Sequence, residues 1–168
     1  MIFRKALLTD INGIMNIIRQ AQEFFRENGI EQWQNNYPNE ETVADDIKHY
    51  NGYVLVKGND IIGTVAVLFQ EEKSYGHIEG KWLSDGQYAT VHRIAVAGKY
   101  KGKGYASDIL RNIEEMCRQK NIFSIRVDTH EKNIAMQKLL DKNGFIYCGI
   151  IYLEDGSKRN AYEKIIEL

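Results

Sequence analysis

The stretch RIAVAGKYKGKGYASDIL, residues 93–110, carries the strongest structural signal in the sequence. It begins as a short apolar strand, continues as a loop of glycine and lysine, and ends as the start of an amphipathic helix. The first N–H groups of a helix have no partner within the helix, and the helix dipole favours negative charge there. Glycines let the backbone approach an oxygen-rich ligand closely. The stretch therefore predicts an anion site, to which Lys99, Lys101 and Lys103 add long-range attraction.

Two common nucleotide-binding patterns are missing from this loop. It does not read GxxxxGK[ST], the pattern of a phosphate-binding loop in nucleotide hydrolases. It also does not read GxGxxG, because Gly102 and Gly104 are followed by Ser107 where the third glycine would stand. Neither of these two nucleotide-binding patterns therefore accounts for the predicted anion site.

The composition is that of an ordinary globular protein. The chain has 168 residues, 43% of them hydrophobic, and a net charge of -1 from 22 basic and 23 acidic side chains. These values predict one domain over residues 1–168 and argue against a nucleic-acid or membrane-surface partner. No apolar run reaches the length of a membrane span, and the charged N-terminal stretch does not resemble a signal peptide, so we expect a cytoplasmic location.

The two cysteines, Cys117 and Cys148, lie in apolar periodic segments. Neither belongs to a CxxC motif or to a paired Cys/His spacing, so the sequence predicts no metal site. We expect both to be buried free thiols in a reducing compartment.

Hydrophobic periodicity predicts a strand or a helix for most of the chain. The first helix is expected to start after Thr9 as its N-cap and the second after Asn39. The turns 58–60 and 154–157 predict two hairpins. The expected strands are residues 1–6, 52–57, 61–70, 77–81, 88–96, 123–127, 145–153 and 158–168. The expected helices follow residue 9, residue 39 and the glycine loop, with a last one over residues 133–142, where Ala135, Met136, Leu139 and Leu140 are expected inside.

This order mixes hairpins with a strand–helix–strand crossover. It predicts an α+β fold in which a mixed, mostly antiparallel central sheet has helices on both faces.

The loop and its surroundings resemble the GNAT family of N-acetyltransferases. The family's acyl-CoA loop reads Arg/Gln-x-x-Gly-x-Gly/Ala, and residues 101–106 read KGKGYA, with Gly104 and Ala106 at the small positions. The preceding HRIAV is similar to the family's fourth strand, and NIAMQKLLDKNGF, residues 133–145, is similar to its asparagine-containing helix. The resemblance implies a GNAT-like acyl-CoA N-acyltransferase fold, with acetyl-CoA as the co-substrate.

The resemblance also implies which residues bind the coenzyme. Three strand residues would line the pantetheine arm, the loop amides would hold the pyrophosphate, and the helix asparagine would bond near the arm. The implied residues are Ile94, Ala95, Val96, Lys101, Gly102, Lys103, Gly104, Tyr105, Ala106, Ser107 and Asn133. The alternative is a tight glycine turn with solvated lysines.

Transfer of an acetyl group to an amine needs a proton acceptor, and two residues are candidates for this role. His92 is the first because it shares strand parity with Ile94 and Val96 and is mostly neutral at pH 7. Some family members, among them arylalkylamine N-acetyltransferases, are similar here and carry a His at this place. Glu79 is the second and would act through water. The alternative for His92 is a packed or surface histidine without a catalytic role, and the alternative for Glu79 is an exposed loop carboxylate.

One position departs from the family pattern. Many members carry a tyrosine seven positions after the helix asparagine, which acts as the general acid, but this chain has Leu140 there. Tyr147, Tyr100 or Tyr105 could take that role. The departure leaves open a second function, that of a catalytically weak or inactive acyl-CoA-binding regulatory protein.

The acceptor amine is expected to meet the N-terminal half of the chain. Residues 24–38 gather four aromatic side chains with two carboxylates, which suits a cationic amine. Those aromatics are Phe24, Phe25, Trp33 and Tyr37. They suit a core edge or a dimer contact equally well. The expected partners are thus a small-molecule or peptide amine and, through the C-terminal hairpin strands, a second copy of the chain.

Overall fold

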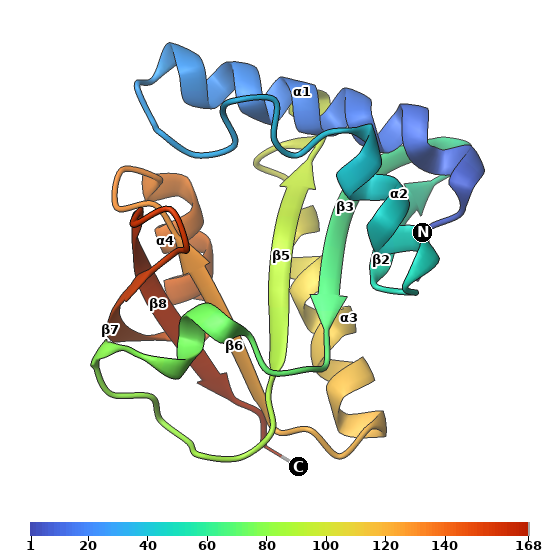
Figure 1. Cartoon of the computed structure of the whole chain (residues 1–168). Helices are drawn as coiled ribbons and strands as arrows, with labels where there is room; N and C mark the ends of the chain where they lie inside the picture. The colour runs from blue at the N-terminus through green and yellow to red at the C-terminus, as the bar shows by residue number, and fades with distance from the viewer. Residues whose placement is uncertain (168) are drawn as a thin grey trace. The chain divides into compact units, whose positions relative to one another are not determined.

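The computed structural model describes residues 1–167. The chain forms two compact units, residues 1–67 with 92–112, and residues 68–91 with those from 113 onward. Strand β5 (Ala89–Val96) and helix α3 (Tyr105–Gln119) each contribute residues to both units. Figure 1 shows the helices and strands of the chain, coloured by residue number.

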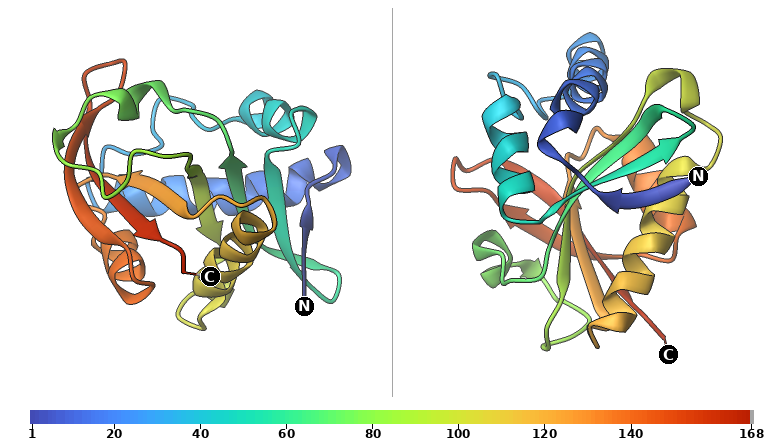
Figure 2. Two further views of the ribbon diagram at one scale, coloured as in Figure 1. Left: turned by 90° about the horizontal axis from the view of Figure 1, so that it is seen from below. Right: turned by 90° about the vertical axis from the view of Figure 1, so that its right-hand side faces the viewer.

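The sheet of the first unit follows the order β1-β2-β3-β5. Its strands are β1 (Ile2–Lys5), β2 (Gly52–Lys57), β3 (Asp60–Leu68) and the second half of β5. β1 lies antiparallel beside β2, and β2 beside β3 (Figure 2). The predicted hairpin at 58–60 is confirmed, because Lys57 pairs with Asp60 across a two-residue turn.

A bulge in β3 decides which side chains face which helices. Leu55 pairs with Gly63 and Val56 with Ile61, so Ile62 is an extra residue in β3. Ile61 packs on the core cluster under α1. Two residues further along, a Cβ placed on Gly63 would lie 2.7 Å from Cδ1 of Ile109 in α3.

Two helices cover one face of this sheet, α1 (Ile11–Glu27) and α2 (Glu40–Lys48). The amphipathic period of α1 puts its apolar side chains on the face toward the strands. The buried cluster comprises Ala6, Ile14, Met15, Ile18, Val43, Ile47 and Val54. Asn39 caps α2 as predicted, since its side chain accepts a hydrogen bond from Thr42 N at 3.0 Å.

The prediction that Thr9 caps the first helix is wrong. A single 3-10 turn, Leu8–Asp10, precedes α1, and the N-cap residue is Asp10. The Asp10 carboxylate accepts a hydrogen bond from Leu7 N at 2.7 Å and is bound by both Nη atoms of Arg4 at 2.7 and 3.1 Å. The hydrogen bond from Arg4 lowers the pKa of Asp10. The Asp10 carboxylate sets the start of the helix because its charge-assisted hydrogen bonds are stronger than the bond that the Thr9 hydroxyl could form as a cap.

The sheet of the second unit follows the order β5-β6-β8-β7-β4. Its remaining strands are β4 (Glu79–Gly80), β6 (Ser124–Thr129), β7 (Ile146–Tyr152) and β8 (Lys158–Ile165). β6 runs parallel to β5, and the other neighbouring pairs are antiparallel. The hairpin predicted at 154–157 is confirmed, but β8 ends at Ile165. The predicted strand ran to residue 168, which lies outside the described residues.

Helix α4 (Ile134–Lys142) follows β6 in the second unit. Leu140 is fully buried, and Met136 and Leu139 are partly buried, as predicted. Ala135 is exposed instead, because the apolar stripe of this short helix is narrower than expected.

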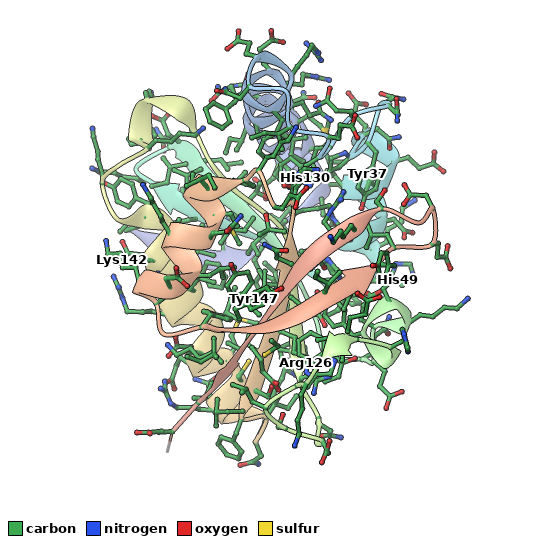
Figure 3. The ribbon with its side chains drawn as sticks, turned by 90° about the vertical axis from the view of Figure 1, so that its left-hand side faces the viewer. Tyr37, His49, Arg126, His130, Lys142 and Tyr147 are labelled. Carbon is green, nitrogen blue, oxygen red and sulfur yellow. The ribbon has the colours of Figure 1, made fainter. Side chains whose placement is uncertain are left out.

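A charged network lies within the second unit, on strands β6 and β8. Glu163 is 0% exposed and accepts hydrogen bonds from four donors at 2.5–3.2 Å: Leu83 N, Ser84 Oγ, Ser124 Oγ and Arg126 Nε. Arg126 belongs to β6 and is labelled in Figure 3. Its guanidinium lies 4.2 Å from the ring centre of Trp82 and 4.1 Å from that of Tyr88. The network ties residues 83 and 84 to the sheet.

The predicted fold class is confirmed. The strands form a mixed, mostly antiparallel arrangement with four α-helices. In the first unit α1 and α2 pack on the face of Val54, and α3 packs on the opposite face, that of Leu55 and Gly63. Within residues 1–167, no helix is both long enough and apolar enough to cross a bilayer.

Candidate active site

The glycine loop joins β5 to α3 in the first unit. Gly102 has φ +75° and Gly104 has φ +85°, a left-handed backbone that side chains other than glycine rarely adopt. Residues 101–104 are exposed. The first helical hydrogen bond runs from Asp108 N to Gly104 O, so the amides of Tyr105 and Ala106 come before it. This is the strand–loop–helix geometry that binds phosphate groups.

The loop lysines rest on neighbouring side chains. Lys99 Nζ lies 3.5 Å from an Asp60 carboxylate oxygen, and Lys103 lies 5.8 Å from the ring centre of Tyr100. Lys101, at the position that corresponds to Arg or Gln in the family pattern, lies 4.7 Å from the ring centre of Phe24. The lysines therefore raise the positive charge around the loop, and the exposed backbone of residues 101–104 stays open to solvent.

Helix α1 holds the start of the loop. Gln20 Oε1 accepts a hydrogen bond from Gly98 N at 2.7 Å. An open groove of about 570 Å³ lies here, lined by Asn16, Arg19, Gln20, Glu23, Phe24, Glu27, Gly98, Lys99 and Lys101. On the other side, Lys57 donates a hydrogen bond to the hydroxyl of Tyr105 at 2.9 Å. The hydroxyl of Tyr105 is therefore hydrogen-bonded to the hairpin that joins β2 and β3.

The second half of β5 leaves an apolar surface partly open. Residues 92–96 are each half-buried, whereas Ala89, Thr90 and Val91 are fully buried. The half-buried residues include Ile94, Ala95 and Val96, which the family resemblance assigns to the pantetheine arm. Apolar side chains of intermediate exposure on a central strand suit a ligand that covers them.

The alternation along β5 is broken at Arg93. This residue has φ +54° in the middle of the strand. The prediction that His92 shares a face with Ile94 and Val96 assumed an unbroken period of two, which does not hold across a left-handed residue. His92 is half-buried and directly precedes this turn.

The side chain of Arg93 forms a clamp that the sequence reasoning missed. Its Nε and Nη2 donate to the two carboxylate oxygens of Asp46 at 2.9 and 2.5 Å, and its Nη1 donates to the Tyr37 hydroxyl at 3.0 Å. The only signal in the sequence was a charged residue inside the apolar strand RIAV.

Glu79 and Asn133 belong to the second unit. Glu79 is exposed on β4, and its carboxylate accepts a hydrogen bond from the Tyr152 hydroxyl at 3.2 Å. Asn133 is buried and caps α4, because its side chain accepts a hydrogen bond from Met136 N at 3.2 Å. His130 accepts from Lys132 N through Nδ1 at 3.0 Å and so shapes the turn before that helix. The catalytic role of Glu79 and the coenzyme role of Asn133 stay predictions.

The position of the missing tyrosine is a core position. Leu140 is 0% exposed, so its side chain does not meet solvent. Of the three tyrosines considered as substitutes, Tyr147 is 52% exposed and packs edge-on against Tyr162 at 5.7 Å. The hydroxyls of Tyr100 and Tyr105 are bonded to Asp60 and Lys57, respectively.

Of the four aromatic residues predicted to meet the acceptor, two pack against the core and two are exposed. Phe25 and Trp33 pack edge-on at 5.6 Å, and both belong to the interior. Phe24 lies under Lys101 beside the glycine loop. Tyr37 (labelled in Figure 3) is 46% exposed, and its hydroxyl is held by Arg93. Tyr37 is therefore the aromatic of this group that connects an exposed ring to β5.

Among residues 1–167, no three His, Cys, Asp or Glu side chains come together in a group that could hold a metal ion.

Comparison with known proteins establishes the family. Residues 15–145 match the model of the acetyltransferase (GNAT) family. A GNAT-family acetyltransferase from Streptococcus agalactiae is 36% identical, with a TM-score of 0.91 over 99% of this chain and 96% of its own. No curated protein sequence matches. The chain thus belongs to the GNAT family of acetyltransferases, as the resemblance implied.

More distant structures share the fold. A GNAT-family acetyltransferase from Listeria monocytogenes is 17% identical, with a TM-score of 0.75 over 98% of this chain and 94% of its own. A ribosomal-protein-alanine N-acetyltransferase from Brucella melitensis is 16% identical, with a TM-score of 0.72 over 99% of this chain and 100% of its own.

Proposed function

We propose that this protein transfers the acetyl group of acetyl-CoA directly to a primary amine, and that the loop of residues 102–107 binds the pyrophosphate. The observation that carries the proposal is the left-handed pair Gly102 and Gly104 at the start of α3. Backbone amides at a helix N-terminus favour an oxygen-rich anion, and exposed glycines allow its close approach. The half-buried Ile94, Ala95 and Val96 next to the loop suit the apolar pantetheine arm.

The acceptor amine must lose a proton before it can attack. An alkyl amine with a pKa near 10.4 is neutral in roughly one molecule in 2,500 at pH 7, which costs about 4.6 kcal/mol. His92 would accept this proton, directly or through water, because an imidazole nitrogen can act as a general base. Glu79 is the alternative acceptor. A backbone N–H near Val96, implied by the family, would stabilise the oxyanion.

In the overall reaction, the amine nitrogen bonds to the acetyl carbon while the bond from that carbon to sulfur breaks. Acetyl-CoA supplies the activated acetyl group. The leaving thiolate belongs to a thiol with a pKa near 8.5, so it can depart without a strong acid. The buried Leu140 is therefore compatible with turnover.

Leu140 also motivates the second candidate, a protein that binds acyl-CoA and turns it over weakly or not at all. Rates of acetyl transfer to a panel of amines, including a peptide with a free N-terminus, separate the two. Transfer that His92→Ala or Glu79→Ala slows supports the enzyme and identifies its proton acceptor. Acetyl-CoA binding with no transfer to any amine of the panel supports the second candidate.

The first test is a calorimetric titration of the protein with acetyl-CoA. We expect Gly104→Asp to abolish binding, because a carboxylate and a Cβ enter a left-handed position facing the pyrophosphate. Gly156→Asp is the matched control, since Gly156 has φ +83° and, like Gly104, no described atom within 4 Å of an added Cβ. If the wild-type protein does not bind acetyl-CoA, or if both variants bind equally well, the proposed site is wrong.

A further inference from the structure

Arg93 adopts a backbone conformation that nothing in its local sequence favours. It has φ +54° within β5, between His92 and Ile94. A residue with a Cβ in the left-handed region is held there only when surrounding contacts impose the conformation. The contacts of its side chain supply such a constraint.

Those contacts form a nearly buried fork. The side chains of Arg93 and Asp46 are 15% and 16% exposed, and two N–H groups of the guanidinium face the two carboxylate oxygens. Paired bonds of this kind fix the orientation of both groups as well as their distance. A third N–H donates to the Tyr37 hydroxyl. The guanidinium is thus held in direction, and through it the backbone of residue 93.

The groups on the far side of the fork are themselves anchored. Asp46 lies on α2, which packs on the core through Val43 and Ile47. The loop of Tyr37 is held by α1, because Gln22 Nε2 donates to the carbonyl oxygens of Tyr37 and Pro38, both at 3.0 Å. β5 is therefore fastened to two helices at one residue.

We propose that Arg93 is a positioning residue for acetyl transfer, which it serves by fixing the left-handed turn of β5 between His92 and Ile94. This inference rests on the proposed function. The residues on either side of the turn are the leading proton acceptor and the first of the pantetheine residues. When the clamp is present, their backbone directions are set relative to each other. When it is lost, the strand relaxes toward regular alternation and both move.

The expected effect falls on the chemical step more than on coenzyme affinity. A displacement of about 1 Å in reacting groups can lower a rate on the order of 100-fold. The pyrophosphate loop begins several residues further along and has its own anchor at Gln20. We therefore expect Arg93→Ala to lower kcat roughly tenfold or more, while the Kd for acetyl-CoA changes by a smaller factor.

The test compares Arg93→Ala, Arg93→Lys and Tyr37→Phe with the wild-type protein. The measurements are kcat with the best amine of the panel, the Kd for acetyl-CoA, and hydrogen–deuterium exchange of peptides that cover residues 89–97. Lysine keeps the charge and loses the fork, and phenylalanine removes a single bond. These two variants decide the question if the alanine variant does not fold. We expect faster exchange at residues 92–96 and a lower kcat in both arginine variants, with a smaller change in Tyr37→Phe.

Arg4→Ala is the matched control, because Arg4 makes a comparable two-pronged pair with Asp10 and the proposed mechanism gives neither residue a role. It should lower stability but leave kcat and the exchange of residues 92–96 unchanged. A folded Arg93→Lys protein with wild-type kcat and exchange would overturn the proposal. Failure of the wild-type protein to bind acetyl-CoA would instead refute the proposed function, and the exchange measurement would still test the clamp.

Discussion

Glu163→Gln is the substitution that should reveal most about the second unit. Glu163 is a fully buried carboxylate that receives four hydrogen bonds, one of them from the nearly buried guanidinium of Arg126. Glutamine has almost the same shape but no charge. Its NH₂ group must also face one of the donors, such as Leu83 N, that the carboxylate now accepts from. The variant therefore leaves a buried positive charge without its counter-ion.

The magnitude follows from that uncompensated charge. Removing one partner of a buried ion pair costs about 3–5 kcal/mol. With an unfolding entropy of about 2.1 cal/mol/K per residue, a chain of 168 residues would lose roughly 8–14 °C in Tm. This is a large fraction of the stability of a typical domain.

The effect should depend on pH in a defined direction. Burial alone would raise the pKa of Glu163, but the hydrogen bonds from Ser124, Ser84 and Leu83 bring it below its usual value. A carboxylate with a lowered folded pKa stabilises the chain above its unfolded pKa, about 4.3, and that stabilisation is lost as the pH falls through the folded pKa. Glutamine does not titrate here. The difference between wild type and variant is therefore largest at neutral pH and narrows in acid.

Urea unfolding followed by circular dichroism, at pH 7 and in steps down through pH 4, measures this difference. Glu115→Gln is the control, because Glu115 is exposed and its ion pair with Arg118, at 3.5 Å, should contribute less than about 1 kcal/mol. A loss for Glu163→Gln as small as that of the control, or one that is the same at every pH, would refute the reasoning.

Three further predictions concern other parts of the fold and the candidate site. Cys117 and Cys148 should not react with a thiol reagent at pH 7 until the chain unfolds, because burial raises the pKa of Cys117 to about 12 and also raises that of Cys148; rapid labelling without unfolding would contradict this. Gly63→Ala should destabilise the chain by about 1–3 kcal/mol through its clash with Ile109, and Ile109→Val should recover part of that loss in urea unfolding. Leu140→Tyr should lower Tm through overpacking and leave acetyl transfer no faster; a faster, stable variant would show that the general acid had been restored.

Local chemistry made much of the fold predictable. The two-residue turn after Lys57, the Asn39 cap and the helix after the glycine loop are each specified by residues a few positions apart. Thr9 and Asp10 show the limit of this approach, because both suit a helix start and the choice depends on Arg4 in the preceding strand. The sequence alone offers no measure of such a contact.

The candidate site also has parts that the sequence predicted and parts that it did not. The proposed coenzyme loop could be recognised because its glycines, lysines and helix start are adjacent in the chain. The turn at Arg93 could not, since an arginine has no local preference for φ +54° and its cause, Asp46, lies far earlier in the sequence. The different surroundings of the predicted acceptor aromatics could not be foreseen for a related reason. Nothing local distinguishes Phe25 and Trp33, which pack inward, from Tyr37, whose ring is exposed.

The order of strands in the second unit has a consequence for synthesis on the ribosome. β8 lies between β6 and β7, yet it is made after both. At about 5–20 residues per second, several seconds pass between the completion of β6 and that of β8. During this interval the edges of β6 and β7 that β8 will occupy are open to pairing with other chains. Protection of the nascent chain by chaperones should therefore matter most between the synthesis of β6 and the pairing of β8.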